Sequence, residues 1–144
     1  MPSAPSVGDT AAPFTLDDQF QAAHAVAFDA GSPVVIVFAD RGCADDVEPW
    51  ARTLAGRLGG VARVLGVAAV GGVPALFQGA VRGFLQDKPS VLLDWGNRVS
   101  DAFGYDGGAC LVVAVDAGGT VRARVPGAFS EAGYAEVARA VGAA

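Results

Sequence analysis

The stretch from Pro33 to Trp50 constrains the fold more than any other part of the sequence. Val34 to Phe38 are five consecutive β-branched or aromatic residues, opened by a proline and followed by glycine and aspartates. This composition is typical of a buried central strand, and the residues after it favour the start of a helix. Cys43, one of only two cysteines, therefore lies at the predicted junction between strand and helix.

The position of Cys43 determines its expected chemistry. Backbone N–H groups at a helix N-terminus are unpaired and partly positive, so they favour the thiolate, which is the reactive form of cysteine. Arg41, two residues earlier, acts in the same direction. Asp45, Asp46 and Glu48 follow the cysteine, and their negative charges disfavour the thiolate. Cys43 is therefore either a reactive thiol open to incoming molecules or a small apolar residue that packs inertly.

The rest of the chain alternates predicted strands with predicted helices. Their order implies an α/β fold in which a central mixed β-sheet carries helices on both faces, preceded by an N-terminal β-hairpin. Strands are expected at 14–16 and 25–28, which form the hairpin, and at 34–38, 61–67, 90–94, 111–116 and 121–125. The helix that follows Cys43 is expected to end at residue 58, and further helices are expected at 76–85, 97–103 and 130–141.

Length and charge limit the organisation of the protein and its partners. A chain of 144 residues can bury most of its apolar surface without metals or disulfides, so we expect one domain at 12–144 after a flexible lead at 1–11. The formal charge is −5 and no basic stripe occurs, which argues against nucleic acid and anionic membranes as partners. The first residues lack a secretion-signal pattern, so we expect a cytoplasmic location.

No cofactor or metal is expected from the motifs. A single histidine excludes most zinc-ligand sets, and two cysteines so far apart cannot be a disulfide framework. The glycine pairs at 71–72 and 107–108 lack the strand, Gly-x-Gly-x-x-Gly and helix context that binds phosphate. The sequence therefore gives no support for nucleotide binding.

Four separated stretches share a pattern that spans nearly the whole chain. They are Val7-Gly8-Asp9-Thr10-Ala11-Ala12-Pro13-Phe14-Thr15-Leu16; Phe38 followed five residues later by Cys43; Leu92-Leu93-Asp94 with Val99, Ala102 and Phe103-Gly104-Tyr105; and Val113-Ala114-Val115-Asp116 with Gly119 and Val121-Arg122. In order and spacing they resemble the thioredoxin-like redoxin superfamily, namely its branch of AhpC/TSA peroxiredoxins and bacterial thiol–disulfide oxidoreductases. The resemblance implies a thioredoxin-like fold. It also implies a thiol reductant, a protein disulfide or a peroxide as partner.

The active-site positions depart from the pattern of that superfamily. Asp46 stands where the dithiol branch has its second cysteine. Cys110 stands six residues before Asp116, where that branch has a cis-proline and where many peroxiredoxins have an arginine at or beside the position. The peroxiredoxin pattern Pro-x-x-x-Thr-x-x-Cys is absent, and Pro49 lies two residues closer to Cys43 than the usual helix proline. The resemblance therefore supports the fold more fully than the activity.

Both cysteines nevertheless map to active-site positions of the superfamily. The resemblance implies that Cys110 projects from a loop facing Cys43. In the hypothesis that follows, Cys43 attacks the substrate and Cys110 resolves the mixed disulfide. The two Cα atoms must then lie within about 7 Å. The alternative is that Cys110 is a buried apolar residue that begins the strand from Leu111.

Three further side chains have two interpretations each. Asp46 could relay a proton to the thiol, or it could belong to an ordinary helix N-cap with acidic first-turn residues. Trp50 and Trp95 flank the predicted site, where they could form an apolar docking surface for a protein substrate or pack in the core.

Two functional hypotheses follow. In the leading one, the protein is a thiol-based redox protein that reduces a disulfide or a peroxide through Cys43, with Cys110 as the resolving cysteine and Arg41 in a supporting role. In the alternative, the protein is a non-catalytic thioredoxin-like interaction module that kept the scaffold and lost the chemistry.

Overall fold

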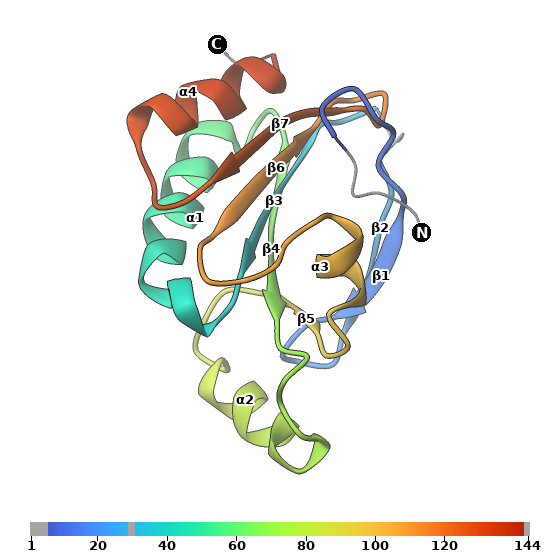
Figure 1. Ribbon diagram of the computed structural model, residues 1–144, viewed down its shortest axis with the longest axis vertical. Coiled ribbons are helices and arrows are strands. Elements are labelled where there is room, and N and C mark those ends of the chain that lie inside the picture. The colour runs from blue at the N-terminus through green and yellow to red at the C-terminus, as the bar shows by residue number, and fades with distance from the viewer. Residues whose placement is uncertain (1–5, 29–30, 143–144) are drawn as a thin grey trace.

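The computed structural model describes residues 6–28 and 31–142. Strands and helices follow one another largely in the predicted order (Figure 1). In chain order the elements are β1 (Phe14–Asp17), β2 (Ala23–Val26), β3 (Val34–Ala39), the 3-10 turn η1 (Arg41–Cys43), α1 (Ala44–Leu58), β4 (Arg63–Ala69), the 3-10 turn η2 (Ala75–Phe77), α2 (Gln78–Phe84), β5 (Leu92–Asp94), α3 (Arg98–Ala102), β6 (Leu111–Val115), β7 (Val121–Pro126) and α4 (Glu131–Ala140).

A five-stranded mixed sheet in the order β5-β4-β3-β6-β7 forms the centre of the molecule. β3 pairs in parallel with β4 and antiparallel with β6, so the strand with the five-residue apolar run lies in the middle of the sheet. Val35, Ile36 and Phe38 are fully buried there, as expected for a strand that is covered on both faces. The predicted mixed α/β sheet is confirmed.

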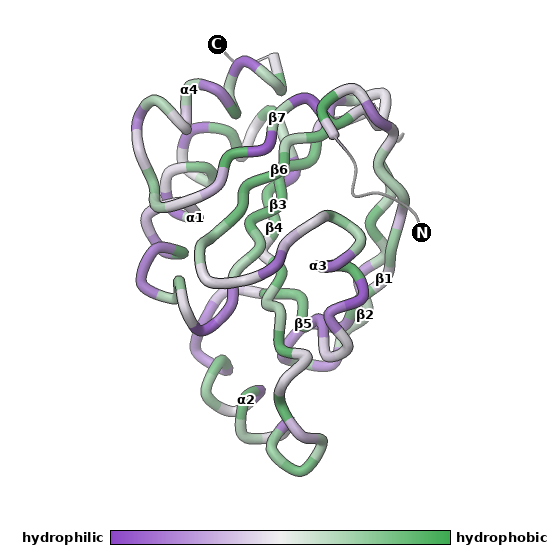
Figure 2. Tube along the Cα trace, viewed as in Figure 1, coloured by the Kyte–Doolittle hydropathy of each residue, from purple (hydrophilic) through white to green (hydrophobic). Residues whose placement is uncertain are grey.

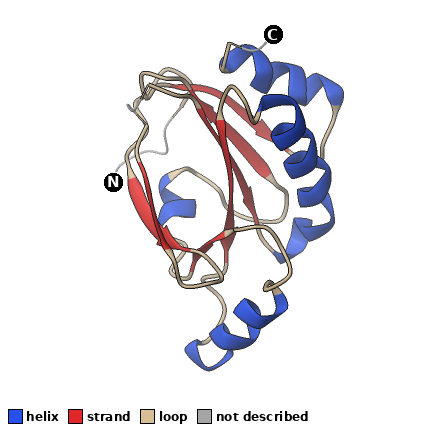
Figure 3. Ribbon diagram, turned by 180° about the vertical axis from the view of Figure 1, so that it is seen from behind, coloured by secondary structure: helices blue, strands red, loops and turns tan. Residues whose placement is uncertain are grey.

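Helices cover both faces of this sheet, as the sequence predicts. α1 and α4 lie side by side on one face, whereas α3 and the separate β1–β2 hairpin lie over the other (Figure 1, Figure 3). Each face has its own cluster of buried side chains. Trp50 and Leu54 of α1 belong to the first cluster. Phe38 and Phe103 belong to the second.

Some details differ from the predictions. β2 ends at Val26, two residues before the predicted end. β4 begins at Arg63 because the N–H groups of the two preceding residues both donate to the carbonyl of Leu58 and close a turn there. Ala102, which the pattern places on the inner face of its helix, is exposed, whereas the neighbouring Phe103 is buried.

The helix predicted at 76–85 forms but does not join the core. η2 and α2 extend beyond the end of the sheet (Figure 1). Leu76, Phe77 and Phe84 are 86%, 55% and 77% exposed, and Figure 2 shows apolar positions along this protruding segment. Within the described residues, neither α2 nor any other helix has the length and apolar character needed to cross a membrane.

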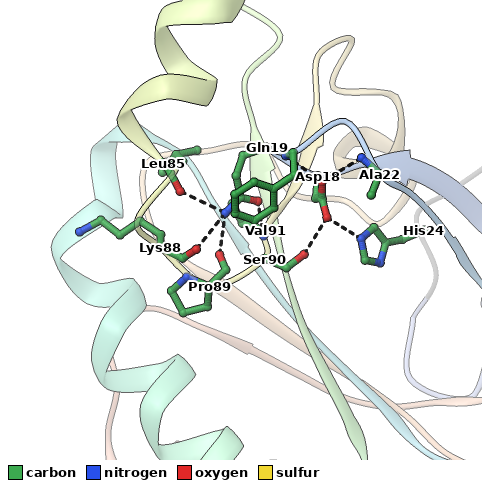
Figure 4. Close-up of polar contacts among 10 residues, drawn as sticks. Asp18, Gln19, Ala22, His24, Leu85, Lys88, Pro89, Ser90 and Val91 are labelled. Carbon is green, nitrogen blue, oxygen red and sulfur yellow. Dashed lines mark hydrogen bonds and ion pairs between the residues drawn. The ribbon is translucent and has the colours of Figure 1, made fainter.

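A buried glutamine ties the loop after α2 to the hairpin (Figure 4). Gln19 is 1% exposed, and its side-chain amide makes four hydrogen bonds with the backbone of that loop. Nε2 donates to the carbonyl oxygens of Leu85 (3.2 Å), Lys88 (3.2 Å) and Pro89 (2.9 Å), and Oε1 accepts from the N–H of Val91 (2.9 Å). These hydrogen bonds, rather than apolar packing of α2, hold this segment against the hairpin.

Asp18, next to this glutamine, joins the same two segments. Its carboxylate pairs with Nε2 of His24 at 2.7 Å and accepts from the hydroxyl of Ser90 at 3.2 Å (Figure 4). It also accepts from the backbone N–H groups of Phe20 and Ala22, which fixes the hairpin turn. We call Asp18 and Gln19, with the partners named here, the polar clamp.

Backbone hydrogen bonds join residues 8–11 to the end of the sheet. The N–H of Gly8 donates to the carbonyl of Val121 at 2.8 Å, and the N–H of Ala11 donates to that of Gly119 at 2.9 Å. These bonds attach residues 8–11 to the β6–β7 turn. Residues 1–5 of the predicted flexible lead lie outside the described residues.

Candidate active site

The two cysteines lie at the same end of neighbouring strands. β3 leads through Asp40 into η1, so that Cys43 is both the last residue of η1 and the N-cap of α1. Cys110 directly precedes β6, whose Leu111 pairs with Phe38 near the end of β3. Antiparallel pairing therefore brings a residue before β6 close to a residue after β3.

The cysteine side chains point toward each other. Their Sγ atoms are 2.8 Å apart. Sγ of Cys110 also lies 3.5 Å from the carbonyl oxygen of Cys43. Both thiols are free in this structure. The two cysteines thus lie next to each other, as the resemblance implies.

Both cysteines are nearly sealed from solvent. Cys43 is 3% exposed and Cys110 is 1% exposed, so the expected open thiol at Cys43 does not occur in this conformation. The reason lies in the loop before β6, which folds over the end of η1 and brings the backbone of Gly108 against Gly42. A Cβ added at Gly42 would lie 3.1 Å from the carbonyl oxygen of Gly108.

Asp40 links these two loops. Its Oδ1 accepts from the N–H of Gly42 at 2.8 Å, and its Oδ2 accepts from the N–H of Gly108 at 3.0 Å. Asp40 is therefore the N-cap of η1 as well as a bridge to the loop that carries Cys110. Asp40 is not among the site residues predicted from the sequence, although an aspartate between a strand and a helix is a recognised capping signal.

Tyr105 completes the surroundings of the sulfurs. Its hydroxyl lies 3.8 Å from Sγ of Cys43, and its ring stacks on Phe38 with the ring centroids 6.0 Å apart. Burial, followed by the contact with Cys43, raises the pKa of the Tyr105 hydroxyl. The same two causes raise the pKa of the Cys110 thiol. Both groups are therefore protonated at neutral pH and can act as hydrogen-bond donors.

Trp50 is a core residue and cannot form an open docking surface. It is fully buried, its ring packs edge-on against Phe129, and its indole N–H donates to the carbonyl of Gly127 at 3.0 Å. The N–H of Gly127 in turn donates to the carbonyl of Cys110 at 2.8 Å. Trp50 thus supports the backbone next to Cys110. The four-residue spacing of Trp50, Leu54 and Leu58, all fully buried, is the sequence signal for this role.

The other predicted site residues lie at the edge of this cluster or outside it. Arg41 is exposed in η1. Asp46 is half-buried in the first turn of α1 without being its N-cap, and its charge contributes to the raised pKa of Cys110. Trp95 is half-buried beneath the guanidinium of Arg82, 5.3 Å from the ring centroid.

Trp95 belongs to a different concavity. It helps to line a groove of about 1010 Å³ between the hairpin and α3, together with Phe14 and Arg98. Neither cysteine lines this groove. Among the described residues, no group of three or more His, Cys, Asp or Glu side chains is arranged to hold a metal ion.

Comparisons with known proteins establish the fold. No protein-family model matches the chain, and no curated protein sequence does so either. Among solved structures, the exposed lipoprotein thioredoxin Etrx1 of Streptococcus pneumoniae has a TM-score of 0.70 at 19% identity, covering 89% of this chain and 98% of that one. The thioredoxin domain of a thiol-disulfide oxidoreductase from Bacteroides vulgatus has a TM-score of 0.69 at 16% identity, covering 96% and 99%.

A third similar structure is a peroxidoxin. Peroxidoxin BcpB of Mycobacterium tuberculosis has a TM-score of 0.65 at 21% identity and covers 96% of both chains. These likenesses extend over nearly the whole chain. The thioredoxin-like fold predicted from the four sequence stretches is confirmed.

Proposed function

We propose that this thioredoxin-like protein is a thiol-based redox protein whose Cys43 and Cys110 interconvert between a dithiol and a disulfide. The observation that carries the proposal is the 2.8 Å contact between the two Sγ atoms. A disulfide bond measures about 2.05 Å, so bond formation needs an approach of only about 0.8 Å. The pair is therefore pre-organised for oxidation without rearrangement of the sheet.

The two cysteines have different roles in this proposal. Burial and the contact with Cys43 raise the pKa of Cys110, which keeps this residue a thiol at neutral pH. Cys43 caps α1, whose first N–H groups are unpaired and attract negative charge. Cys43 is thus the attacking sulfur and Cys110 the resolving one.

The proposed exchange balances as two consecutive substitutions at sulfur. The Cys43 thiolate attacks one sulfur of a substrate disulfide, which forms a mixed disulfide and releases the first substrate thiolate. Cys110 then gives its proton to the released substrate thiolate and attacks Sγ of Cys43, which releases the second substrate thiolate. The substrate disulfide is reduced to two thiols, and the protein is left with a Cys43–Cys110 disulfide that an external thiol reductant reduces again.

A peroxide is the second substrate class for the same pair. Cys43 would attack a peroxide oxygen, become a sulfenic acid and release water or an alcohol, after which Cys110 would condense with it and release water. The fold is shared with both a thiol-disulfide oxidoreductase and a peroxidoxin, so it supports either class. A protein disulfide is our first choice because the motif Pro-x-x-x-Thr-x-x-Cys of peroxiredoxins is absent.

The burial of both sulfurs favours a second candidate function. Cysteines that are 3% and 1% exposed also suit a non-catalytic interaction module in which they only fill the core. The cytoplasmic location and the absence of nucleic-acid and membrane partners remain predictions from the sequence.

Peptide mapping separates the two candidates. The reduced protein is treated with glutathione disulfide or hydrogen peroxide, then alkylated, digested with trypsin without reduction and analysed by mass spectrometry. We expect a link between fragments 42–52 and 99–122, which carry the two cysteines. Failure to form this link in the folded protein with either oxidant would leave the interaction module as the explanation.

Single serine variants test the assignment of roles. Cys110→Ser should accumulate a glutathione adduct on Cys43, because the resolving sulfur is absent. Cys43→Ser should form no such adduct, because the raised pKa of Cys110 keeps that thiol protonated. An adduct found chiefly on Cys110 would reverse the roles of the two residues.

A further inference from the structure

Tyr105 is the only tyrosine among the described residues that contacts a cysteine in this structure. Its hydroxyl oxygen is 3.8 Å from Sγ of Cys43, and no other partner of that hydroxyl occurs among the described residues. The residue is 5% exposed and lies in the loop that leads from α3 to Cys110. The stacked ring of Phe38 fixes the plane of its side chain.

We infer that Tyr105 is a catalytic residue of the cysteine pair, whose hydroxyl donates a hydrogen bond to the reduced sulfur of Cys43. This inference rests on the proposed function and deepens it. The hydroxyl contacts Sγ of Cys43, the reacting atom. The tyrosine approaches from the face of the sheet opposite to α1, because Tyr105 packs in the second buried cluster and Cys43 in the first. The Tyr105 hydroxyl and Sγ of Cys110 thus both lie against Sγ of Cys43.

A hydrogen bond between Tyr105 and a Cys43 thiolate has one possible direction, because the thiolate has no proton to donate. Asp40 and Asp46 are the acidic groups whose charges act on the pair, and they oppose the formation of a further negative charge. Because burial and the contact with Cys43 raise the pKa of Tyr105, its hydroxyl keeps its proton throughout the physiological range. Tyr105 is therefore able to donate to the Cys43 thiolate and does not act as a base.

A donor of this kind changes the redox equilibrium in a defined direction. It stabilises the reduced sulfur, and most strongly the thiolate, whereas a disulfide sulfur is a weaker acceptor. Stabilising the reduced form makes the disulfide easier to reduce. Loss of the hydroxyl should therefore stabilise the Cys43–Cys110 disulfide and disfavour the Cys43 thiolate.

Tyr105→Phe removes only this hydroxyl, and the chain contains a matched control. Tyr134, the other tyrosine, is half-buried on α4, where Arg57 lies 4.8 Å above its ring. Both variants and the unchanged protein are equilibrated in glutathione buffers, and the fraction with the internal disulfide is measured by mass spectrometry. The pH dependence of Cys43 labelling by iodoacetamide is followed on fragment 42–52.

The expected result is specific to Tyr105. In Tyr105→Phe the equilibrium constant should shift about three- to tenfold toward the disulfide, where tenfold corresponds to about 30 mV. The pH of half-maximal Cys43 labelling should rise, while Tyr134→Phe should match the unchanged protein in both measurements. Circular dichroism checks that both variants are folded.

Failure of this inference differs from failure of the proposed function. If the unchanged protein forms the disulfide and Tyr105→Phe matches it in equilibrium and pH profile, Tyr105 only packs in the core and the inference is wrong. If the unchanged protein forms no disulfide, the proposed function itself is wrong. A shift of Tyr105→Phe toward the reduced form would also overturn the inference, because it has the opposite sign.

Discussion

Helices α1 and α2 come from similar sequence patterns, but α1 is packed against the sheet and α2 is exposed. Apolar residues recur three and four positions apart in both segments, which predicts a helix in each case. α1 lies across the sheet and buries Trp50, Leu54 and Leu58 completely, whereas α2 buries none of its residues. Periodicity therefore specifies that a segment is helical, but whether its apolar side is covered depends on the elements that surround it.

The attachment of the two helices differs in kind as well. α1 is held by apolar contact with β3 and β4 and continues directly from the loop that carries Cys43. α2 lies beyond the end of the sheet and is connected to the hairpin through the polar clamp of Asp18 and Gln19 (Figure 4). The cysteine site thus rests on the strongly packed part of the molecule.

Leu54→Ala should have the largest effect on stability. The side chain is fully buried between α1 and the sheet, so its truncation leaves a cavity as well as lost apolar contact. We expect the free energy of unfolding to fall by about 3–5 kcal/mol. Urea unfolding followed by circular dichroism measures it, and a loss below about 1 kcal/mol would mean that α1 is packed no better than α2.

Gln19→Ala should have the second-largest effect on stability, and it should destabilise α2 rather than α1. The substitution leaves three carbonyl oxygens and one N–H of the loop after α2 without their side-chain partner. We expect the free energy of unfolding to fall by about 2 kcal/mol. Hydrogen exchange should accelerate over residues 78–91 and stay unchanged in α1. Gln86→Ala, at an exposed amide of the same junction, is the control and should cost less than about 1 kcal/mol.

Acid should loosen the polar clamp before it affects α1. The hydrogen bond with His24, together with the backbone donors of the hairpin turn, lowers the pKa of Asp18 from 3.8 to about 2. Because the folded pKa is the lower one, this contribution to stability is complete above pH 3.8 and is lost as the pH falls toward 2. Asp18→Asn should weaken the fall in stability across that range, whereas Asp17→Asn, at the exposed neighbour, should not.

Leu76→Ala should have the smallest effect, although the substitution is the same as at Leu54. The side chain is 86% exposed in η2, so truncation removes little buried area and should change stability by less than about 0.5 kcal/mol. The same urea titration measures the difference. A loss above about 1 kcal/mol would show that this side chain is covered in solution by something outside the chain described here.

The sheet and the meeting of the two cysteines could be predicted, because they follow from local patterns and from strand order. The apolar run before Asp40 indicates a central strand, and the resemblance implies that Cys110 faces Cys43. The buried side of α1 could also have been predicted from the four-residue spacing that begins at Trp50.

The remaining features of the site depend on loop conformation and therefore escaped prediction. Tyr105 reaches Cys43 because Gly104, Gly107 and Gly108 adopt positive φ angles, which bend the loop before β6 over the end of η1. Burial of the two sulfurs is a further result of this bend. No spacing rule in a single sequence specifies such a path, since each glycine permits several conformations.

The link that Asp40 makes between the two loops has a kinetic consequence for the proposed chemistry. The Asp40 side chain holds the covering loop through a single hydrogen bond, from the N–H of Gly108, so a local opening can expose the thiols while the sheet stays folded. Partner molecules would then react only during such openings. Turnover should rise with oxidant concentration at first and then level off at the frequency with which the loop opens. Between openings, both sulfurs remain shielded from damaging over-oxidation.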